Sequence, residues 1–217
     1  MLSYRDIGRY LVPYVKEMGF THVELLPVTE HPLDASWAIS APATSRPPAA
    51  SAPHTTSCGW WISSTRPASA SSWTGCRPLP QGRLRPVRVD GEPCYEYADP
   101  GRGSTPTGHP VFDYGRSEVR SFLYSSALFW LEQYHIDGLR WMRCSMLYLD
   151  YGRQDGQWVP NVFGGHENLE AVEFLQQLNT HIFSAHSDVM MIAEESTAWP
   201  RVSHPVDKGG LVGRPGL

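Results

Sequence analysis

Residues 168–195 read NLEAVEFLQQLNTHIFSAHSDVMMIAEE, and this stretch decides the fold. Asn168 can cap a helix, because its side-chain oxygen can accept hydrogen bonds from the backbone of the first turn. An apolar strand, Asp188 to Ala193, follows the helix, and Glu194 and Glu195 come directly after it. The stretch therefore predicts a helix followed by a strand that ends in carboxylates. The apolar residues that recur at helical spacing are Leu169, Val172, Leu175, Leu178 and Ile182.

Two earlier segments repeat this order of helix and strand. In the first, Ser3 and Asp6 form a start similar to a capping box, and Gly19 can end the helix. Pro13 inside the pattern predicts a kink. A strand is expected from about His22 to Leu26. The helical stripe comprises Ile7, Tyr10, Leu11, Tyr14, Val15 and Met18.

The other segment begins near Ser117 and ends in a strand from Ile136 to Arg140. Repeated helix–strand units predict an α/β fold with a parallel sheet and helices outside it. Short strands that end in polar residues favour part of a (β/α)8 barrel, whose chemistry lies at the C-terminal ends of its strands. A doubly wound sheet is the alternative, although no glycine-rich phosphate loop follows any strand. The expected buried stripe of this helix is Val119, Phe122, Leu123, Leu128, Leu131 and Tyr134.

Composition excludes several classes of protein. A net charge of −4 over 217 residues gives no reason to expect a nucleic-acid partner or an anionic membrane. No apolar run approaches the roughly 18 residues that a bilayer span needs. The N-terminus lacks a basic region followed by an apolar run, so a cytoplasmic protein is expected. The four cysteines form no CxxC pair and no metal-ligand spacing, which predicts free thiols and no metal site.

The middle of the chain does not fit this pattern. Residues 38–88 contain no Asp, Glu, Lys, Asn, Phe, Tyr or Met, and are rich in Ala, Ser, Pro, Thr, Arg, Gly and Trp. Such a composition is typical of a disordered linker. Three tryptophans, Trp60, Trp61 and Trp73, are unusual for a linker, and a long irregular insert is unusual in a barrel.

Several residues could carry chemistry. Glu194 stands where a strand ends, so it is a candidate acid or base, with a salt bridge or a helix cap as the structural alternative. Arg140 ends the preceding strand by the same logic, and His31 follows the first strand. The aromatic residues that could stack on sugar rings, or simply pack in a core, are Trp37, Tyr148, Trp158 and Trp199.

About two-thirds of the chain resembles the bacterial 1,4-α-glucan (glycogen) branching enzymes of the α-amylase clan. LSYRDIGRYLVPYVKEMGFTHVELLPVTEHPLDASW is similar to the segment around the second barrel strand, and YGRSEVRSFLYSSALFWLEQYHIDGLR to the fourth helix and strand unit. MMIAEESTAWPRVSHPVDKGGL is similar to the fifth strand and its continuation. The most specific match is SMLYLDYGRQDGQWVPNVFGGHENLEAVEFLQQLN, residues 145–179, because generic amylases lack this pattern.

The resemblance implies a retaining glucan transferase without a cofactor or a metal. Glu194 would be the proton donor, and Arg140 would support a nucleophilic Asp two residues later. His31, Trp37 and Glu195 would contact substrate. The partner would be an α-glucan, glycogen or amylose, and the intact enzyme would be monomeric. A related hydrolase of the same clan, a non-catalytic glucan-binding remnant and a functionless fragment are the alternatives.

The chain departs from the family where the nucleophile should stand. The pattern G-L-R-V-D-A-V becomes Gly138-Leu139-Arg140 followed by Trp141-Met142-Arg143-Cys144, so the chain as written is expected to be inactive. A shift of reading frame accounts for this, because TGG-ATG-CGG read one base upstream becomes GTG-GAT-GCG, or V-D-A.

A shift of reading frame can also account for the middle segment. Codons can be chosen for residues 60–77 that, shifted by one base, read L-V-D-Q-L-H-Q-A-G-I-G-V-I-L-D-W-V-P, a helix, a glycine turn and a strand. Residues 104–108 and the residues after Leu211 suggest two further shifts. The expected domain is therefore one fragment, residues 1–217, of the catalytic barrel, covering about strands two to five. The family's N-terminal β-sandwich would precede it, and strands six to eight and a C-terminal β domain would follow.

Overall fold

The computed structural model describes residues 4–25, 70–73, 93, 95–99, 102, 111–141, 147–194 and 197–216. The chain divides into two compact units. Unit 1 comprises Met1–Arg77, Ser125–Trp141 and Asp188–Ile192. Unit 2 comprises Pro78–Tyr124, Met142–Ser187 and Ala193–Leu217.

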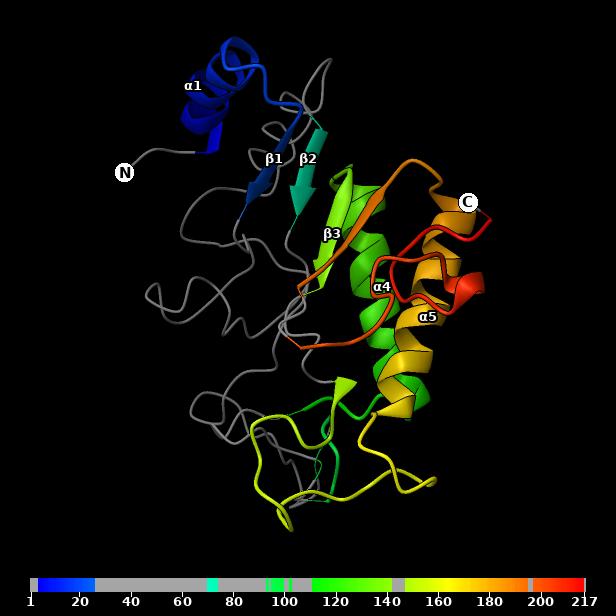
Figure 1. Ribbon diagram of the computed structural model, residues 1–217. Coiled ribbons are helices and arrows are strands. Elements are labelled where there is room, and N and C mark those ends of the chain that lie inside the picture. Colours follow the sequence, from blue (N-terminus) through cyan, green and yellow to red (C-terminus); the bar gives the residue numbers. More distant parts are fainter. Residues whose placement is uncertain are drawn as a thin grey trace. The chain divides into compact units, whose positions relative to one another are not determined.

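A four-stranded sheet with the order β1-β2-β3-β4 forms the framework of unit 1 (Figure 1). β1 pairs with β2 in parallel, and β2 pairs with β3 in parallel. The Met190 backbone N–H donates to the Asp137 carbonyl at 2.8 Å, so β4 begins beside the start of β3. The strands are β1 (His22–Leu25), β2 (Ala70–Trp73), β3 (Gly138–Trp141) and β4 (Met190–Ala193).

The three helix–strand units expected from the sequence are confirmed. The helices are α1 (Tyr4–Glu17), α4 (Ser117–Gln133) and α5 (Leu169–Ala185), and a short 3-10 turn, η3 (Val206–Lys208), lies near the C-terminus. Asn168 caps α5 as expected, because its side chain accepts a hydrogen bond from the Ala171 N–H. The strands are shorter than expected: β3 begins at Gly138 rather than Ile136, and β4 begins at Met190 rather than Asp188.

The apolar face of α1 is only partly buried. Val15 is 4% exposed, whereas Tyr10, Tyr14 and Met18 are 69%, 54% and 54% exposed. The helical spacing of these residues therefore does not make all of them part of the core. Helical periodicity shows which side chains share a face. How much of that face is buried depends on the surface that packs against it.

β2 lies inside the anomalous segment 38–88. Residues 70–73 of this segment form a strand that pairs with β1 on one side and with β3 on the other, with His22 opposite Ala70 and Ser72 opposite Gly138. The expectation of an irregular segment therefore does not hold for residues 70–73. The rest of 38–88 lies outside the described residues. Strand pairing uses backbone groups, which every residue except proline supplies in full, so a strand can form without an apolar pattern.

Each unit has its own apolar core. In unit 1 the indole of Trp130 stacks on Tyr134, with ring centroids 4.6 Å apart, and both side chains are 1% exposed. In unit 2, Phe174 of α5 lies 5.3 Å from Tyr114 and 5.4 Å from Tyr124. The sequence pattern missed Phe174, which is fully buried, and included Leu169, which is 36% exposed. The buried face of α5 consists of Ala171, Phe174, Leu175, Leu178, Asn179 and Ile182.

Polar side chains on α5 hold the C-terminal turn of unit 2. The buried Asn179 amide donates to the carbonyls of Leu175 and Leu211 at 2.8 and 3.0 Å. Gln176 donates to the Gly210 carbonyl at 3.1 Å. A Cβ at Gly210 would lie 1.8 Å from the His204 carbonyl oxygen, so only glycine fits there.

We predict that His135→Gly raises the thermal midpoint of unfolding. His135 links α4 to β3 with φ at 53°, a left-handed conformation that costs a residue with a Cβ roughly 1 kcal/mol. Glycine removes this strain but adds chain entropy, so a gain of about 0.5 kcal/mol is expected. His135→Ala is the matched control and should give no gain, because it keeps the Cβ. Circular dichroism melts of the two variants decide the point.

Candidate functional site

Arg140 lies in β3 on the face of the sheet opposite its buried neighbours. Leu139 and Trp141 are 1% and 2% exposed, whereas the Arg140 side chain is 30% exposed. Successive residues of a strand point to opposite faces, which explains this alternation. Arg140 therefore lies on the face of the sheet opposite Leu139 and Trp141.

The Arg140 guanidinium forms an ion pair with Glu24 of β1. Register explains how two strands that are not neighbours supply this pair. Glu24 is aligned with Ser72, and Ser72 with Gly138, so one row of Cα atoms crosses all three strands. Arg140 is two residues beyond Gly138 and therefore on the same face.

Glu194 follows the last residue of β4 directly and is half-buried. It belongs to unit 2, whereas Arg140 belongs to unit 1. Trp141, the first residue that departs from the expected pattern G-L-R-V-D-A-V, is buried in β3. The other residues expected at the site lie outside the described residues: His31, Trp37, Met142 and Glu195.

The loop between β3 and α5 is closed at its base by backbone pairing. The Leu149 N–H donates to the His166 carbonyl, and the Asn168 N–H donates to the Leu147 carbonyl, both at 2.7 Å. Tyr148 and Glu167 form an antiparallel bridge between these two bonds. The residues between 149 and 166 therefore project from a fixed base.

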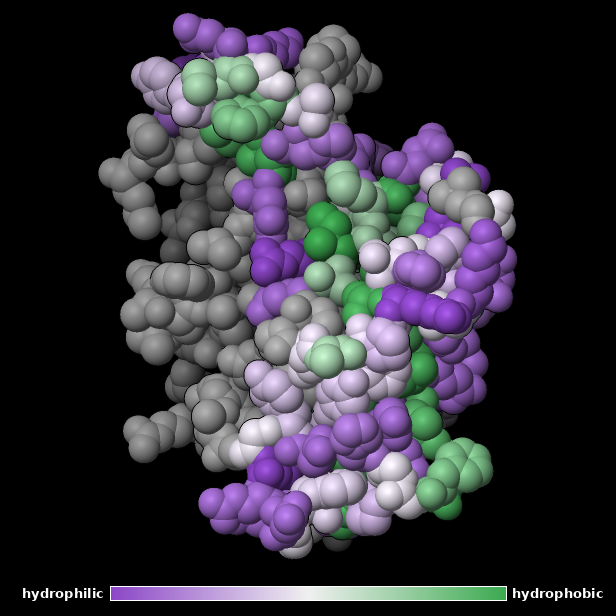
Figure 2. Space-filling view, in the orientation of Figure 1, coloured by the Kyte–Doolittle hydropathy of each residue, from purple (hydrophilic) through white to green (hydrophobic). Residues whose placement is uncertain are grey.

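Asn161 fixes a turn within this loop. Its side-chain oxygen accepts from the N–H groups of Phe163 and Gly165 at 2.9 and 3.0 Å, and its amide donates to the Glu167 carbonyl at 3.0 Å. Val162 and Phe163 are 87% and 86% exposed on this turn. The space-filling view shows a hydrophobic projection over the tip of the loop, at the lower right (Figure 2).

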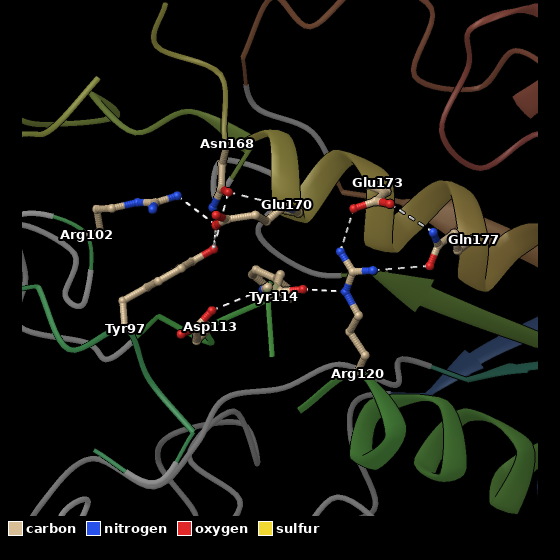
Figure 3. A network of polar contacts seen from close by, with 11 residues as sticks. Tyr97, Arg102, Asp113, Tyr114, Arg120, Asn168, Glu170, Glu173 and Gln177 are labelled. Atoms are coloured by element: carbon tan, nitrogen blue, oxygen red, sulfur yellow. Dashed lines mark hydrogen bonds and ion pairs between the residues drawn. The ribbon is translucent and has the colours of Figure 1, made fainter. Parts of the chain in front are cut away.

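A polar network anchors the start of α5 to residues 95–102 (Figure 3). Glu170 accepts from the Tyr97 hydroxyl at 2.6 Å and from the Arg102 guanidinium at 2.7 Å. The Arg102 guanidinium also lies over the Tyr97 ring, 4.5 Å from its centroid. Sequence reasoning missed this network, because Tyr97 and Glu170 are 73 residues apart and neither forms part of a recognisable motif.

A second group of contacts joins α4 to α5. Arg120 donates to Glu173 at 2.7 Å and to Gln177 at 3.3 Å (Figure 3). It also donates to the Tyr114 carbonyl. One arginine thus bridges the first turn of α4, the segment before it and the exposed side of α5.

Burial shifts the acidity of two tyrosines in unit 2. Tyr97 is 7% exposed, and burial, the hydrogen bond to Glu170 and the charge of that carboxylate raise the pKa of its hydroxyl well above the usual range. Burial also raises the pKa of Tyr124. Tyr97 therefore remains a neutral hydrogen-bond donor, which the Glu170 carboxylate requires.

The described part of the chain contains no cluster of three or more His, Cys, Asp or Glu side chains placed to hold a metal ion. It also contains no helix whose length and apolar character would suit a membrane span.

The fold belongs to the α-amylase class. The structure matches an alpha-amylase from Geobacillus thermoleovorans, solved in complex with acarbose, with a TM-score of 0.66 over 96% of this chain and 44% of that chain. It matches an Anoxybacillus alpha-amylase with a TM-score of 0.69 over 96% and 43% of the two chains. Sequence identity is 16% and 15%, so these matches show the fold alone. They are consistent with part of a (β/α)8 barrel.

Sequence comparison identifies the family. The chain is 46% identical to the 1,4-alpha-glucan branching enzyme GlgB of Nitrosococcus oceani and 46% identical to that of Thermosynechococcus vestitus. Each match covers 97% of this chain and 28% of the relative. No protein-family model matches the chain. The chain belongs to the family of the 1,4-α-glucan branching enzymes, as the sequence predicted, and spans about 28% of the length of these relatives.

We predict that Tyr97→Phe destabilises the protein at neutral pH and reduces its alkaline sensitivity. Losing the hydroxyl removes a buried hydrogen bond to a charged group, which costs about 1–3 kcal/mol. The raised pKa of Tyr97 also means that the unfolded state loses this proton first, at about the ordinary value of 10.0, so wild-type stability should fall as pH rises above 10.

Urea melts between pH 7 and 11 measure both effects. Tyr95→Phe is the matched control, because Tyr95 lies two residues away, is 37% exposed and stacks on Phe122 at 5.3 Å. An equal alkaline loss in Tyr97→Phe and in the wild type would refute the role of Tyr97.

Proposed function

We propose that this chain derives from the catalytic barrel of a 1,4-α-glucan branching enzyme, which cleaves an α-1,4 link and transfers the chain to a 6-hydroxyl in glycogen biosynthesis. The observation that carries the proposal is the 46% identity to such enzymes over 97% of the chain. The 97% of the chain covered by this match is more than the two-thirds whose motifs resemble the family. β1 to β4 then correspond to barrel strands two to five, and residues 1–217 to one part of the catalytic domain, in a cytoplasmic and monomeric enzyme.

Glu194 is the proposed proton donor of a double displacement. A carboxylate nucleophile attacks the anomeric carbon while Glu194 protonates the departing glycosidic oxygen. Glu194, now ionised, then takes the proton from a glucan 6-hydroxyl as that oxygen attacks the glycosyl-enzyme. Its position directly after β4 supports the assignment, because barrel chemistry lies at the ends of strands. His31, Trp37 and Glu195 are proposed substrate contacts.

Arg140 is proposed to support the nucleophile, since a guanidinium beside a carboxylate keeps it ionised. The sequence supplies no such carboxylate: residues 141–143 are Trp, Met and Arg. The chain as written should therefore lack turnover. This absence favours one second candidate, a glucan-binding protein without catalysis.

Frame shifts explain where the chain departs from the family, and β2 supports this explanation. In the shifted reading of residues 60–77, positions 70–73 read G-V-I-L, the strand that follows the glycine turn. Residues 70–73 are the ones that form β2, paired between β1 and β3. The alternative frame thus gives an apolar strand at the position where the sheet has one.

We expect the DNA of this locus to encode V-D-A one base upstream of codons 141–143. The same shift should restore the 18-residue helix and strand over codons 60–77. Sequencing independent clones of the locus tests this directly. If the bases cannot spell the family pattern in any frame, the frame-shift account fails.

We expect the chain as written to form no new α-1,6 branches on amylose. The two carboxylates of a retaining pair act as a unit, so losing one costs several orders of magnitude in rate. Debranching of the product followed by a count of reducing ends measures branch formation. Glu194→Gln is the control: turnover that persists in this variant comes from a contaminant. Turnover by the chain that disappears in Glu194→Gln would contradict the expectation.

A further inference from the structure

Three aromatic rings meet at the base of the loop between β3 and α5. The Tyr148 ring lies 4.9 Å from the His166 ring and 5.1 Å from the Trp199 ring, measured between centroids. The planes are tilted by 58° and 59°, so Tyr148 stands between two rings that meet it at an angle. All three residues belong to unit 2: Tyr148 and His166 come from the loop between β3 and α5, and Trp199 comes from the segment after β4.

The cluster combines apolar faces with exposed polar groups. Tyr148 and Trp199 are half-buried, so packing fixes their rings while leaving part of each accessible. His166 is more open, with 48% of its side chain exposed. Its Nδ1 lies 3.1 Å from Asp150 Oδ2, and its Nε2 lies 3.7 Å from Glu167 Oε1. These carboxylates are 36% and 41% exposed.

The backbone holds this group in place. Tyr148 and Glu167 are bridge partners, and the Leu149 to His166 hydrogen bond runs beside them. Ring positions that are fixed before binding reduce the entropy that a ligand must overcome. Packing alone would account for two touching rings, but it does not require an imidazole and two carboxylates at their open edge.

The chemistry of the cluster suits a neutral polyhydroxyl ligand. A pyranose presents C–H groups on its faces and hydroxyls around its edge, and aromatic rings with nearby carboxylates match both. Two carboxylates beside one histidine disfavour phosphate or nucleic acid, which need cationic groups.

We infer that Tyr148, His166 and Trp199 form a binding subsite for glucose units of an α-glucan chain. The inference rests on the proposed function for the identity of the sugar. Trp199 lies five residues after Glu194 and in the same compact unit, so this part of the subsite lies on the segment that follows the proposed proton donor. His166 and Trp199 stack on pyranose faces and Tyr148, which contacts both rings, holds them in position, while Asp150 and Glu167 accept hydrogen bonds from sugar hydroxyls.

Titration of the 217-residue chain with maltoheptaose, followed by isothermal calorimetry and saturation-transfer NMR, tests the subsite. Trp199→Ala should raise the Kd about tenfold, the scale of losing one anchoring aromatic residue. His166→Gln should raise it by a smaller factor, and this half-exposed position tolerates substitution if Trp199→Ala fails to fold. Phe163→Ala is the matched control, because Phe163 is an aromatic residue of the same loop, 86% exposed, and outside the cluster.

Unchanged affinity in both cluster variants overturns the subsite. Loss of affinity in Phe163→Ala alone also overturns it and moves sugar binding to the tip of the loop. The proposed function fails separately: a chain that binds cellohexaose as well as maltoheptaose, with both weakened by Trp199→Ala, has the subsite but no preference for an α-glucan. Binding of maltoheptaose alone, weakened in the cluster variants, supports both.

Discussion

The parallel pairing of β2 with its two neighbours is the interaction on which the sheet of unit 1 depends. β1 is joined to β3 only through β2 in the strand order, so α1 and β1 are held to the sheet by these backbone hydrogen bonds. The register of β2 also aligns Glu24 with Gly138 and so brings the Arg140 guanidinium within reach of a carboxylate two strands away. A strand of Ala, Ser, Ser and Trp therefore sets the geometry of the Arg140–Glu24 pair.

The sequence predicted the features of the fold that depend on neighbours along the chain. Asn168 caps α5 because the cap and the N–H that it accepts from are three residues apart, and helical spacing identified Leu175, Leu178 and Ile182 as buried. The missed features depend on contacts between distant residues. Tyr97 and Glu170 form no local pattern, and the exposure of Tyr10 and Tyr14 depends on what packs against α1. The residues of β2 themselves show no apolar strand pattern, because pairing is made by the backbone whereas sequence patterns report side chains. Only the shifted reading frame predicted a strand there.

The same difference between local features and distant contacts applies to the candidate site. Glu194 and Arg140 were predicted as site residues because each stands at a strand, where periodicity and polarity change within a few residues. The partner of Arg140 could not be found in this way, because Glu24 is 116 residues earlier in the chain and becomes its partner only through the strand register. From the sequence alone, a carboxylate in a short strand is interpreted as an exposed surface residue. Its partner can be identified only when the residues aligned with it on the other strands are known.

The Glu24 pair also gives Arg140 a counter-ion beside a sequence, Trp141-Met142-Arg143, that contains no carboxylate. An arginine whose carboxylate partner is removed becomes a source of instability if it is enclosed by protein. Arg140 is 30% exposed and has Glu24 as a counter-ion, so its charge does not depend on a carboxylate at position 142. The packing of β3 depends instead on Leu139 and Trp141, which are buried on the opposite face. The burial of β3 and the charge on its other face therefore rest on different side chains of the same four residues, so the strand does not need a carboxylate after Arg140 in order to form.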